Sequence, residues 1–298
     1  MKVAVSGQEL ALWRKQALDS AIASKISIQE VDWLLREVTE LDNLSLRLES
    51  FKNSSQIILS KSLEELSQLW QQRLQEHLPV QYLLNTVYWR NFKLKVTSAV
   101  LIPRPETELI IDIALQAAQN QQLTITEEHW ADLGTGSGAI ALGLATSMPQ
   151  ATIHAVDYSP QALNVAQENA LNLGLQERIN FYQGNWWSPL DSLRGKVRGM
   201  ISNPPYIPSA EVLQLQPEVT RHEPHLALDG GKDGLDDIRH LVEVAPDYLI
   251  SGGIWLIEMM AGQSQTVKQL LENQGEYEEI TIFFDLAGIE RFALAYRR

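Results

Sequence analysis

Residues 130–142 read Trp-Ala-Asp-Leu-Gly-Thr-Gly-Ser-Gly-Ala-Ile-Ala-Leu. A short apolar run enters three alternating glycines and leaves as an alanine-rich segment, which predicts a strand, a tight turn and a helix. Glycine suits a backbone that turns sharply or approaches a ligand. Dinucleotide-binding domains share this layout, but their fingerprint has a two-residue gap that is missing here. The candidate cofactor-binding residues of this turn are Gly134, Thr135, Gly136, Ser137 and Gly138.

Two acids accompany the turn. Asp132 precedes the glycines. We expect it to face the cationic amino-acid end of a cofactor, either directly or through an intervening water. Asp157 ends the next expected strand, at the spacing where an acceptor meets ribose hydroxyls. The alternative for Asp157 is a helix cap, because Ser159-Pro160 follows it. Its distance from the glycine turn favours the ribose.

A second motif, Asn203-Pro204-Pro205-Tyr206, follows a run that resembles a buried strand, residues 197–202. The Asn side-chain oxygen and the Pro204 carbonyl are acceptors, and the prolines stiffen the loop and remove backbone donors. Tyr206 offers an apolar surface for a flat group. The loop therefore suits an NH2 group on a planar nitrogen, although a plain proline-rich turn is the alternative. Combined with the glycine turn, the motif predicts methyl transfer, with Asn203, Pro204 and Tyr206 catalytic and all four residues binding the substrate.

After Pro103 the chain alternates helices and strands, which predicts an α/β fold with a mostly parallel sheet. The expected strands are His129–Gly134, Ala151–Asp157, Ile179–Gly184, Gly199–Asn203, Gly253–Glu258, Tyr277–Asp285 and Arg291–Tyr296. The expected helices are Glu106–Gln119, Ala139–Ser147, Pro160–Leu173, Leu235–Ile250 and Gln263–Gln274.

The N-terminal part is predicted to be helical. Capping boxes at Ser6 and Ser27 and a start at Ser62 each precede apolar residues at helical spacing, and 44–51 is a shorter candidate. The tryptophans of these segments, Trp13, Trp33 and Trp70, are expected in the core. Period-two alternation from 87 to 96 predicts a hairpin. We expect a helical substrate-docking domain at 1–84, a β-hairpin linker at 85–102 and a catalytic domain at 103–298.

Composition narrows the function. The net charge is −13, and residues 101–298 carry 26 acidic against 12 basic side chains. So acidic a segment is poorly suited to binding the phosphate backbone of a nucleic acid. No apolar run reaches the roughly 18 residues of a membrane span, so we expect a cytoplasmic protein with no membrane partner. Cysteine is absent, which excludes thiolate chemistry. His222 and His225 flank Glu223, but Pro224 interrupts a helix there, so we expect no metal.

Across nearly its whole length the sequence resembles the HemK-like protein-(glutamine-N5) methyltransferases that modify peptide chain release factors. Besides the two motifs, the matching segments are 79–83 (PVQYL), Trp89, 101–108 (LIPRPETE), Asn185-Trp186, 221–224 (RHEP) and Ala227-Leu228. Three positions depart from the pattern. Asn85 and Met260 stand where glycines are expected, and Asn185 stands where an acid is common.

The resemblance implies a class I S-adenosylmethionine-dependent methyltransferase. Its Rossmann-like, seven-stranded sheet would have the order 3-2-1-4-5-7-6, with the last strand antiparallel. S-adenosyl-L-methionine would be the co-substrate, with residues 134–138 around its methionine end, Asp157 on its ribose and Trp186 beside its adenine. Asn203 would contact both cofactor and substrate. The implied substrate is the Gln of the Gly-Gly-Gln loop in class I release factors, and we expect a monomer.

Three alternatives remain open. An adenine-N6 methyltransferase of DNA or RNA would also present an exocyclic NH2 to Asn203, but the chain lacks an evident basic patch. A glutamine methyltransferase of a ribosomal protein would share both motifs. A cofactor-dependent binding module would bind without turnover.

Overall fold

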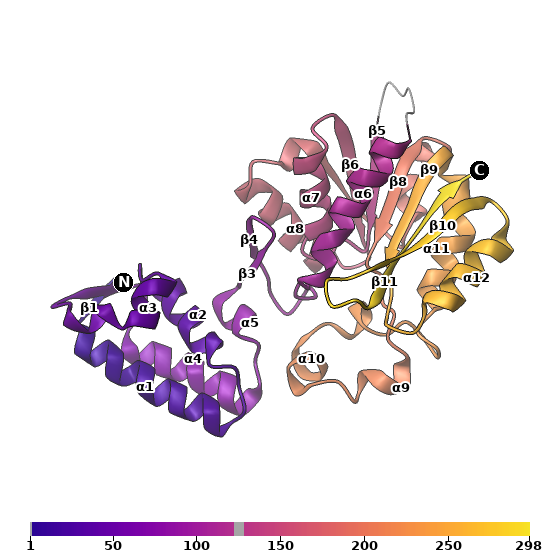
Figure 1. Cartoon of the computed structure of the whole chain (residues 1–298). Helices are drawn as coiled ribbons and strands as arrows, with labels where there is room; N and C mark the ends of the chain where they lie inside the picture. Colours follow the sequence, from indigo (N-terminus) through magenta and orange to yellow (C-terminus); the bar gives the residue numbers. More distant parts are fainter. Residues whose placement is uncertain (1, 122–127) are drawn as a thin grey trace. The chain divides into compact units, whose positions relative to one another are not determined.

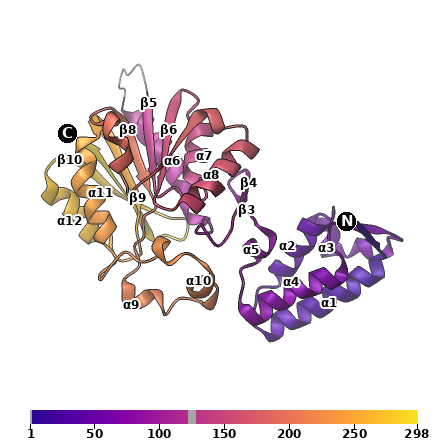
Figure 2. The same ribbon diagram turned by 180° about the vertical axis from the view of Figure 1, so that it is seen from behind.

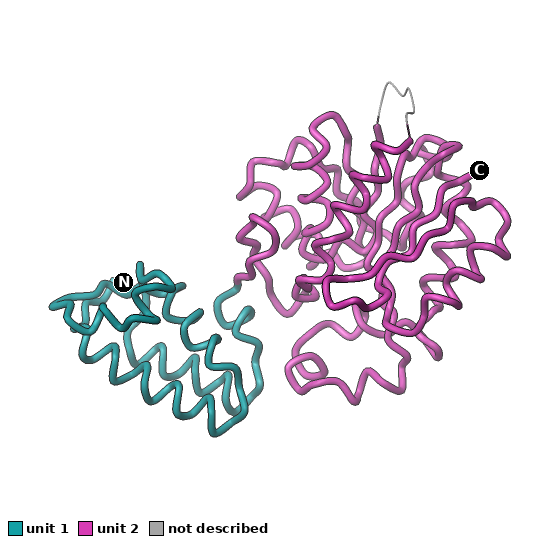
Figure 3. Tube along the Cα trace, in the orientation of Figure 1, with its two compact units in different colours: residues 1–85 teal, residues 86–298 magenta. Residues whose placement is uncertain are grey.

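A computed structural model of the chain describes residues 2–121 and 128–298. The chain divides into two compact units, Met1–Asn85 and Thr86–Arg298 (Figure 3). The division places the hairpin of β3 (Thr86–Trp89) and β4 (Phe92–Lys95) in the second unit. Its turn falls at Arg90-Asn91, as the alternation predicts.

The first unit is mainly helical, as predicted. Its elements are β1 (Val3–Val5), α1 (Gly7–Ala23), α2 (Gln29–Val38), α3 (Asn43–Leu48), η1 (Ser50–Asn53), β2 (Ile57–Leu59), α4 (Leu63–Glu76) and α5 (Val80–Leu84). Capping boxes begin α1 at Ser6 and α4 at Ser62. The expected box at Ser27 is wrong, because Ile28 in a helical conformation is the N-cap of α2 and no side chain caps it. The antiparallel pairing of β1 with β2 escaped prediction, since three-residue strands are too short to show alternation.

Aromatic residues join the helices of the first unit. Trp13 of α1 donates its indole N–H to Ser67 of α4 at 3.0 Å, and Trp70 of α4 donates to Ser20 of α1 at 2.8 Å. Both rings are buried, as expected for core residues, whereas Trp33 is half-buried. Each buried indole thus places its apolar body in the core and gives its polar atom a partner.

The second unit contains the predicted seven-stranded sheet (Figure 1). Its strands are β5 (Glu128–Leu133), β6 (Ala151–Asp157), β7 (Ile179–Gln183), β8 (Val197–Ser202), β9 (Leu249–Glu258), β10 (Tyr277–Phe284) and β11 (Glu290–Arg297). They lie in the order β10-β11-β9-β8-β5-β6-β7. With β5 counted as the first strand, this is the expected order, and the last strand is antiparallel to both of its neighbours.

Helices cover the sheet. The remaining elements of the second unit are η2 (Glu106–Glu108), α6 (Leu109–Asn120), α7 (Ala139–Ser147), α8 (Pro160–Asn172), η3 (Gln176–Arg178), η4 (Ser188–Leu193), α9 (Ser209–Val212), α10 (Pro217–His222), η5 (His225–Ala227), α11 (Asp236–Val244), η6 (Ala245–Asp247) and α12 (Ser264–Gln274). Seen from both sides, α6 and α11 lie on opposite faces of the sheet (Figures 1 and 2). The expected helix 235–250 is too long, because Pro246 lies in η6 and β9 begins at Leu249.

Successive side chains of a strand point to opposite faces of the sheet, and helices cover both faces, so residues of either parity are buried. Ala131 and Leu133 of β5 join a buried cluster that includes Leu241 of α11 and Leu271 of α12. Trp130, the neighbour of Ala131 in β5, points to the other face, where its ring covers Gly199 of β8. No helix among the described residues is long and apolar enough to cross a membrane.

Candidate active site

The glycine turn joins β5 to α7 in the predicted place. Gly134, Gly136 and Gly138 all have a left-handed backbone, with φ of 78°, 55° and 83°, which other residues rarely adopt. The Gly134 and Thr135 amides each donate to the Val156 carbonyl at 2.9 Å, so the turn is fixed to the end of β6. A side chain at Gly136 would meet nothing within 4 Å, whereas one at Gly138 would press on Ala166 of α8 at 3.1 Å. Gly136 therefore faces open space and Gly138 permits helix packing.

A cavity of about 260 Å³ opens above this turn. The predicted site residues that line it are Gly134, Gly136, Asp157, Trp186, Asn203 and Pro205. Thr135, Ser137 and Gly138 do not line it. Thr135 and Ser137 are buried and build the turn, and the Ser137 carbonyl accepts from Asn169 of α8 at 2.9 Å. The cavity lies at the carboxyl ends of β5, β6 and β8, where open α/β sheets bind ligands.

Asp132 does not face the cavity, so the expectation that it meets the cofactor is not supported by its position. Its side chain is fully buried, and its Oδ2 accepts from the Thr135 hydroxyl at 2.6 Å and from the Ala141 amide at 3.0 Å. Burial raises the pKa of Asp132 to about 7, although both hydrogen bonds act in the opposite direction. The carboxyl group therefore ties the glycine turn to the first turn of α7.

Asp157 ends β6 and lines the cavity. Its Oδ2 accepts from the Gly136 amide at 2.8 Å, and its Oδ1 accepts from the Ser159 amide at 2.9 Å. The cap of α8 is Ser159, whose hydroxyl accepts from the Ala162 amide. Burial raises the pKa of Asp157, and its backbone hydrogen bonds lower it. Since Ser159 is the helix cap, the Asp157 carboxylate keeps lone pairs for a ligand in the cavity.

Trp186 forms one wall of the cavity. Its φ of 49° is left-handed, and its ring lies so close to Gly134 that a Cβ there would meet it at 3.2 Å. The indole N–H donates to Asp237 of α11 at 3.2 Å. Asp237 also lines the cavity, and burial raises its pKa. Sequence reasoning missed Asp237, since an acid in the first turn of a helix is ordinarily explained by the helix dipole.

Asn203 follows the end of β8 and contacts a polar cluster. Its Nδ2 lies 3.4 Å from the Thr107 hydroxyl, which donates to Glu258 at 2.6 Å. The Tyr206 hydroxyl donates to the other oxygen of Glu258 at 3.1 Å. Burial and the nearby Glu258 raise the pKa of Tyr206, so its phenol stays protonated. Thr107 and Glu258 were not predicted as site residues, although Thr107 belongs to the LIPRPETE segment.

A second cavity, of about 130 Å³, is lined by Pro204 and Tyr206 together with Arg104, Leu215 and Val219. Asn203 lines both cavities, as do Leu101 and Ala227. The Asn-Pro-Pro-Tyr loop thus borders both cavities. Its Asn faces both of them, its second proline faces the larger, and its first proline and its Tyr face the smaller.

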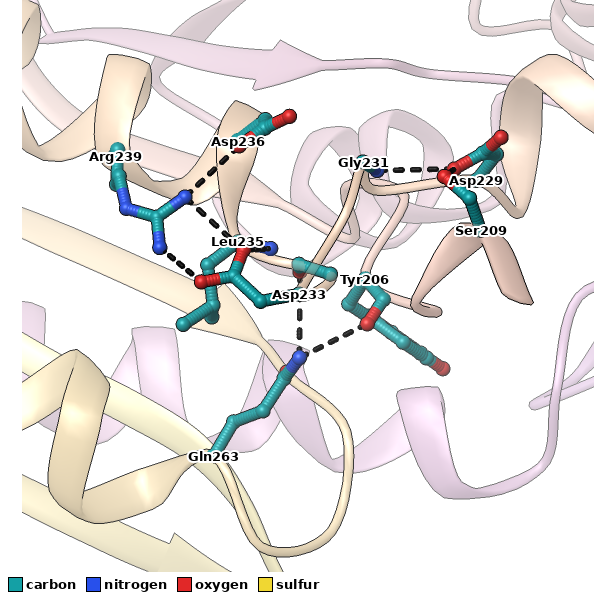
Figure 4. A network of polar contacts seen from close by, with 10 residues as sticks. Tyr206, Ser209, Asp229, Gly231, Asp233, Leu235, Asp236, Arg239 and Gln263 are labelled. Carbon is teal, nitrogen blue, oxygen red and sulfur yellow. Dashed lines mark hydrogen bonds and ion pairs between the residues drawn. The ribbon is translucent and has the colours of Figure 1, made fainter. Parts of the chain in front are cut away.

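The loop is supported from behind by Gln263. Its Nε2 donates to the Tyr206 carbonyl at 2.9 Å and to the Gly234 carbonyl at 3.2 Å, and Figure 4 shows the side chain directed at Tyr206. Its Oε1 accepts from the Met260 amide at 2.9 Å. In the same network Arg239 pairs with Asp233 and Asp236, and Asp229 accepts from Ser209 and Gly231.

The three departures from the family pattern are accommodated. Asn85 has a left-handed backbone with φ of 51° at the end of α5, a conformation that Asn tolerates better than most residues. Met260 is not among the residues with positive φ, so its position does not need glycine. Asn185 is exposed and lines the larger cavity.

Residues 221–228 lie beside both cavities. Glu223 is buried and accepts two hydrogen bonds from one nitrogen of Arg104, both at 2.8 Å. Arg221 is exposed. The His225 ring contacts the Thr220 carbonyl at 3.2 Å. Among the described residues there is no group of three His, Cys, Asp or Glu side chains arranged to hold a metal ion.

Comparison with known proteins decides the family. A release factor glutamine methyltransferase from Synechocystis sp. is 52% identical over 98% of this chain and 97% of its own length. The chain belongs to the release factor glutamine methyltransferase family. A relative of the same name from Thermosynechococcus vestitus is 45% identical over 98% of this chain and 99% of its own length. The methyltransferase small domain family matches residues 110–230.

Solved structures support the fold of this family member. The catalytic domain of hMettl16 in complex with the MAT2A 3′UTR hairpin 6 superposes with a TM-score of 0.55 over 88% of each chain. The two sequences are 14% identical, so the likeness concerns the fold alone. The predicted class I methyltransferase fold is thereby confirmed.

Proposed function

We propose that this chain transfers the methyl group of S-adenosyl-L-methionine to the side-chain amide nitrogen, N5, of the Gln in the Gly-Gly-Gln motif of class I release factors. The observation that carries the proposal is the position of Asn203, which lines both cavities. One side chain can therefore touch a methyl donor in the larger cavity and an amide in the smaller one. The full-length relatives named for this activity support the same conclusion.

The larger cavity fits S-adenosylmethionine by the chemistry of its walls. The open space over Gly136 admits a ligand against the backbone, and the Asp157 oxygens have lone pairs for ribose hydroxyls. The flat ring of Trp186 offers a surface for an adenine. The bound cofactor would supply an electrophilic methyl group on its sulfonium. We accordingly assign Gly134, Gly136, Asp157 and Trp186 to its binding, with the buried residues of the turn supporting them.

On the substrate side the task is to position a weak nucleophile. The lone pair of an amide nitrogen is delocalised into its carbonyl group, so acceptors for its two N–H groups would raise electron density as the nitrogen leaves planarity. In this proposal Asn203 Oδ1 and the Pro204 carbonyl are these acceptors, because both residues line the smaller cavity, and the Tyr206 ring would lie against the flat amide. Positioning contributes roughly 7–11 kcal/mol in favourable cases, so a strong base is not required. The proton would leave late, to water.

The substrate in this proposal is a folded protein. The first unit has its own core and carries none of the residues that line the two cavities. We assign it to docking of the release factor and the second unit, residues 86–298, to catalysis. The excess of acidic side chains in residues 101–298 favours a basic loop on a protein over direct nucleic-acid binding.

The test is direct. Purified protein is incubated with labelled S-adenosylmethionine and unmethylated release factor, and the peptides are analysed by mass spectrometry. We expect one added methyl on the Gln of the Gly-Gly-Gln peptide, and its absence would refute the proposal. Ribosomal proteins in a parallel reaction test the related substrate class. Tight, strongly salt-dependent binding of duplex DNA in a gel shift would favour the adenine alternative.

A further inference from the structure

Behind the Asn-Pro-Pro-Tyr loop lies a carboxylate that lines neither cavity. Glu258, the last residue of β9, is 1% exposed. Its two oxygens accept from hydroxyl groups of two different segments, Oε2 from Thr107 at 2.6 Å and Oε1 from Tyr206 at 3.1 Å. A buried carboxylate is costly unless its oxygens have donors, and here each has one. These bonds make Glu258 the link between residue 107 and the loop.

The hydrogen bond to Glu258 determines whether the Thr107 hydroxyl donates to Asn203 or accepts from it. A hydroxyl has one proton, and a carboxylate can only accept, so the Thr107 proton points to Glu258. Toward Asn203, 3.4 Å away, the Thr107 oxygen can then only accept. The atom of Asn203 that faces it must be the NH2 group, which fixes the orientation of the amide on chemical grounds. Among the described residues Asn203 Oδ1 has no hydrogen-bond partner, so this acceptor is available to a substrate.

We propose that Glu258 and Thr107 are positioning residues that hold the Asn203 amide with its oxygen toward the substrate. The inference rests on the proposed function, because it assigns Asn203 Oδ1 as the acceptor for the glutamine NH2. An amide turned through half a rotation would present its own NH2 to that group and set donor against donor. Glu258 holds Tyr206 in the same way, so one carboxylate would align both side chains of the motif.

The surroundings of Glu258 act on its pKa in both directions. Burial raises its pKa, whereas the hydrogen bonds from Thr107 and Tyr206 lower it. Arg291 also lowers the pKa of Glu258, and Glu106 raises it. Arg291 is itself held by Asp285 at 3.1 Å. Burial is the largest of these effects, so the pKa of Glu258 is raised overall, while the two hydroxyl donors and Arg291 oppose that rise and favour the carboxylate form on which the orientation depends.

The test compares Thr107→Val, which keeps the shape but removes the hydroxyl, with Thr107→Ser, which keeps it. Single-turnover methylation of release factor is measured with both substrates saturating, beside calorimetric affinity for S-adenosylmethionine. We expect Thr107→Val to lower the rate about tenfold with unchanged cofactor affinity, and Thr107→Ser to stay within about threefold of the native rate. Thr281→Val, at an exposed site on β10, is the matched control and should not change the rate.

A double-mutant cycle separates positioning from general damage to the fold. If Thr107 acts through Asn203, adding Thr107→Val to Asn203→Ala should change the residual rate less than about twofold. The same tenfold loss in both backgrounds would overturn the proposal, as would a folded Thr107→Val protein with the native rate.

Glu258→Gln is the second arm, because an amide has one acceptor oxygen where the carboxylate has two. We expect the rate to fall about three- to tenfold with cofactor affinity unchanged, while Glu278→Gln, at an exposed site on β10, leaves the rate unaltered. A folded Glu258→Gln protein with the native rate would overturn the proposal. The native protein is run alongside. If it does not methylate release factor, the proposed function fails, and this outcome is distinct from a variant that matches an active native protein.

Discussion

Replacing Asp157 by alanine tests the cofactor site most directly. The carboxylate lines the larger cavity and accepts from the amides of Gly136 and Ser159 at 2.8 and 2.9 Å. Hydrogen bonds to a charged group contribute about 1.5–3 kcal/mol. If ribose hydroxyls use the remaining lone pairs, Asp157→Ala should weaken S-adenosylmethionine binding by roughly 10- to 150-fold. Asp157→Asn keeps one acceptor oxygen, so its affinity for S-adenosylmethionine should lie between those of the native protein and Asp157→Ala.

The same substitution has a cost in stability, and the assay must separate the two effects. Alanine leaves the Gly136 and Ser159 amides without their acceptor, which should lower the free energy of unfolding by about 1–3 kcal/mol. Ser62→Ala is the control. It removes the cap of α4 in the first unit, with a cost of about 1 kcal/mol, and should leave cofactor affinity unchanged.

Isothermal titration calorimetry gives the affinities, and urea unfolding followed by circular dichroism gives the stabilities. A folded Asp157→Ala protein that binds S-adenosylmethionine as tightly as the native protein would refute the assignment. Asp157 would then serve only to fasten the glycine turn to the start of α8. Equal loss of affinity in Ser62→Ala would instead show that the assay reports stability.

Three further predictions concern the loop, the turn and the first unit. Asn203→Ala should reduce kcat by roughly 10²–10³. Asn203→Asp should retain more activity, because its carboxylate still accepts from the substrate NH2. Near-native single-turnover rates for Asn203→Ala at saturating cofactor would exclude Asn203 as an acceptor for the substrate amide. Asp132 has a pKa of about 7 in the folded protein against 3.8 ordinarily, so the folded state holds its proton more tightly. From about pH 4 to 7 this group should therefore make stability fall with rising pH, by at most about 1.4 kcal/mol per pH unit. Asp132→Asn should remove that contribution, which urea unfolding of both proteins at several pH values would measure, and an unchanged slope would contradict the assigned pKa. A shortened chain of residues 86–298 should, if it folds, bind S-adenosylmethionine normally but fail to methylate intact release factor, and full activity in the mass-spectrometric assay would refute docking by the first unit.

The sequence predicted those parts of the fold that are controlled by local pattern. Hydrophobic periodicity and turn residues indicated the correct place for the glycine turn. They also indicated the correct bounds of the strand at Ala151–Asp157 and of the helix at Ala139–Ser147. The errors occurred where a local pattern has more than one outcome. Ser27 precedes a helix with Glu three residues on, yet the helix starts one residue later. Asp132 was expected at the cofactor because its position matches a ligand contact, but the same carboxylate can fasten the turn from beneath.

The candidate site was predictable only in its contiguous motifs. Residues of the Asn-Pro-Pro-Tyr loop and of the glycine turn are neighbours in sequence, so their chemistry can be recognised together. Thr107 and Glu258 are 151 residues apart, and neither has a local signature of its role. Glu258 ends an apolar strand and Thr107 follows two prolines, so each has an ordinary explanation in isolation. Only their contact in the folded chain makes them part of one site.

The sheet order produces that contact. Strands β8 and β9 are parallel neighbours, and Ser202 pairs with Ile257, so the next residues of the two strands, Asn203 and Glu258, emerge side by side. Periodicity identifies both strands but carries no information on which strands are adjacent, and the order came only from family resemblance. The position of Asn203, the proposed acceptor for the substrate amide, thus depends on a pairing between strands separated by a long connection. For this reason we expect substitutions at the end of β9 to affect the rate of methyl transfer although β9 lines neither cavity.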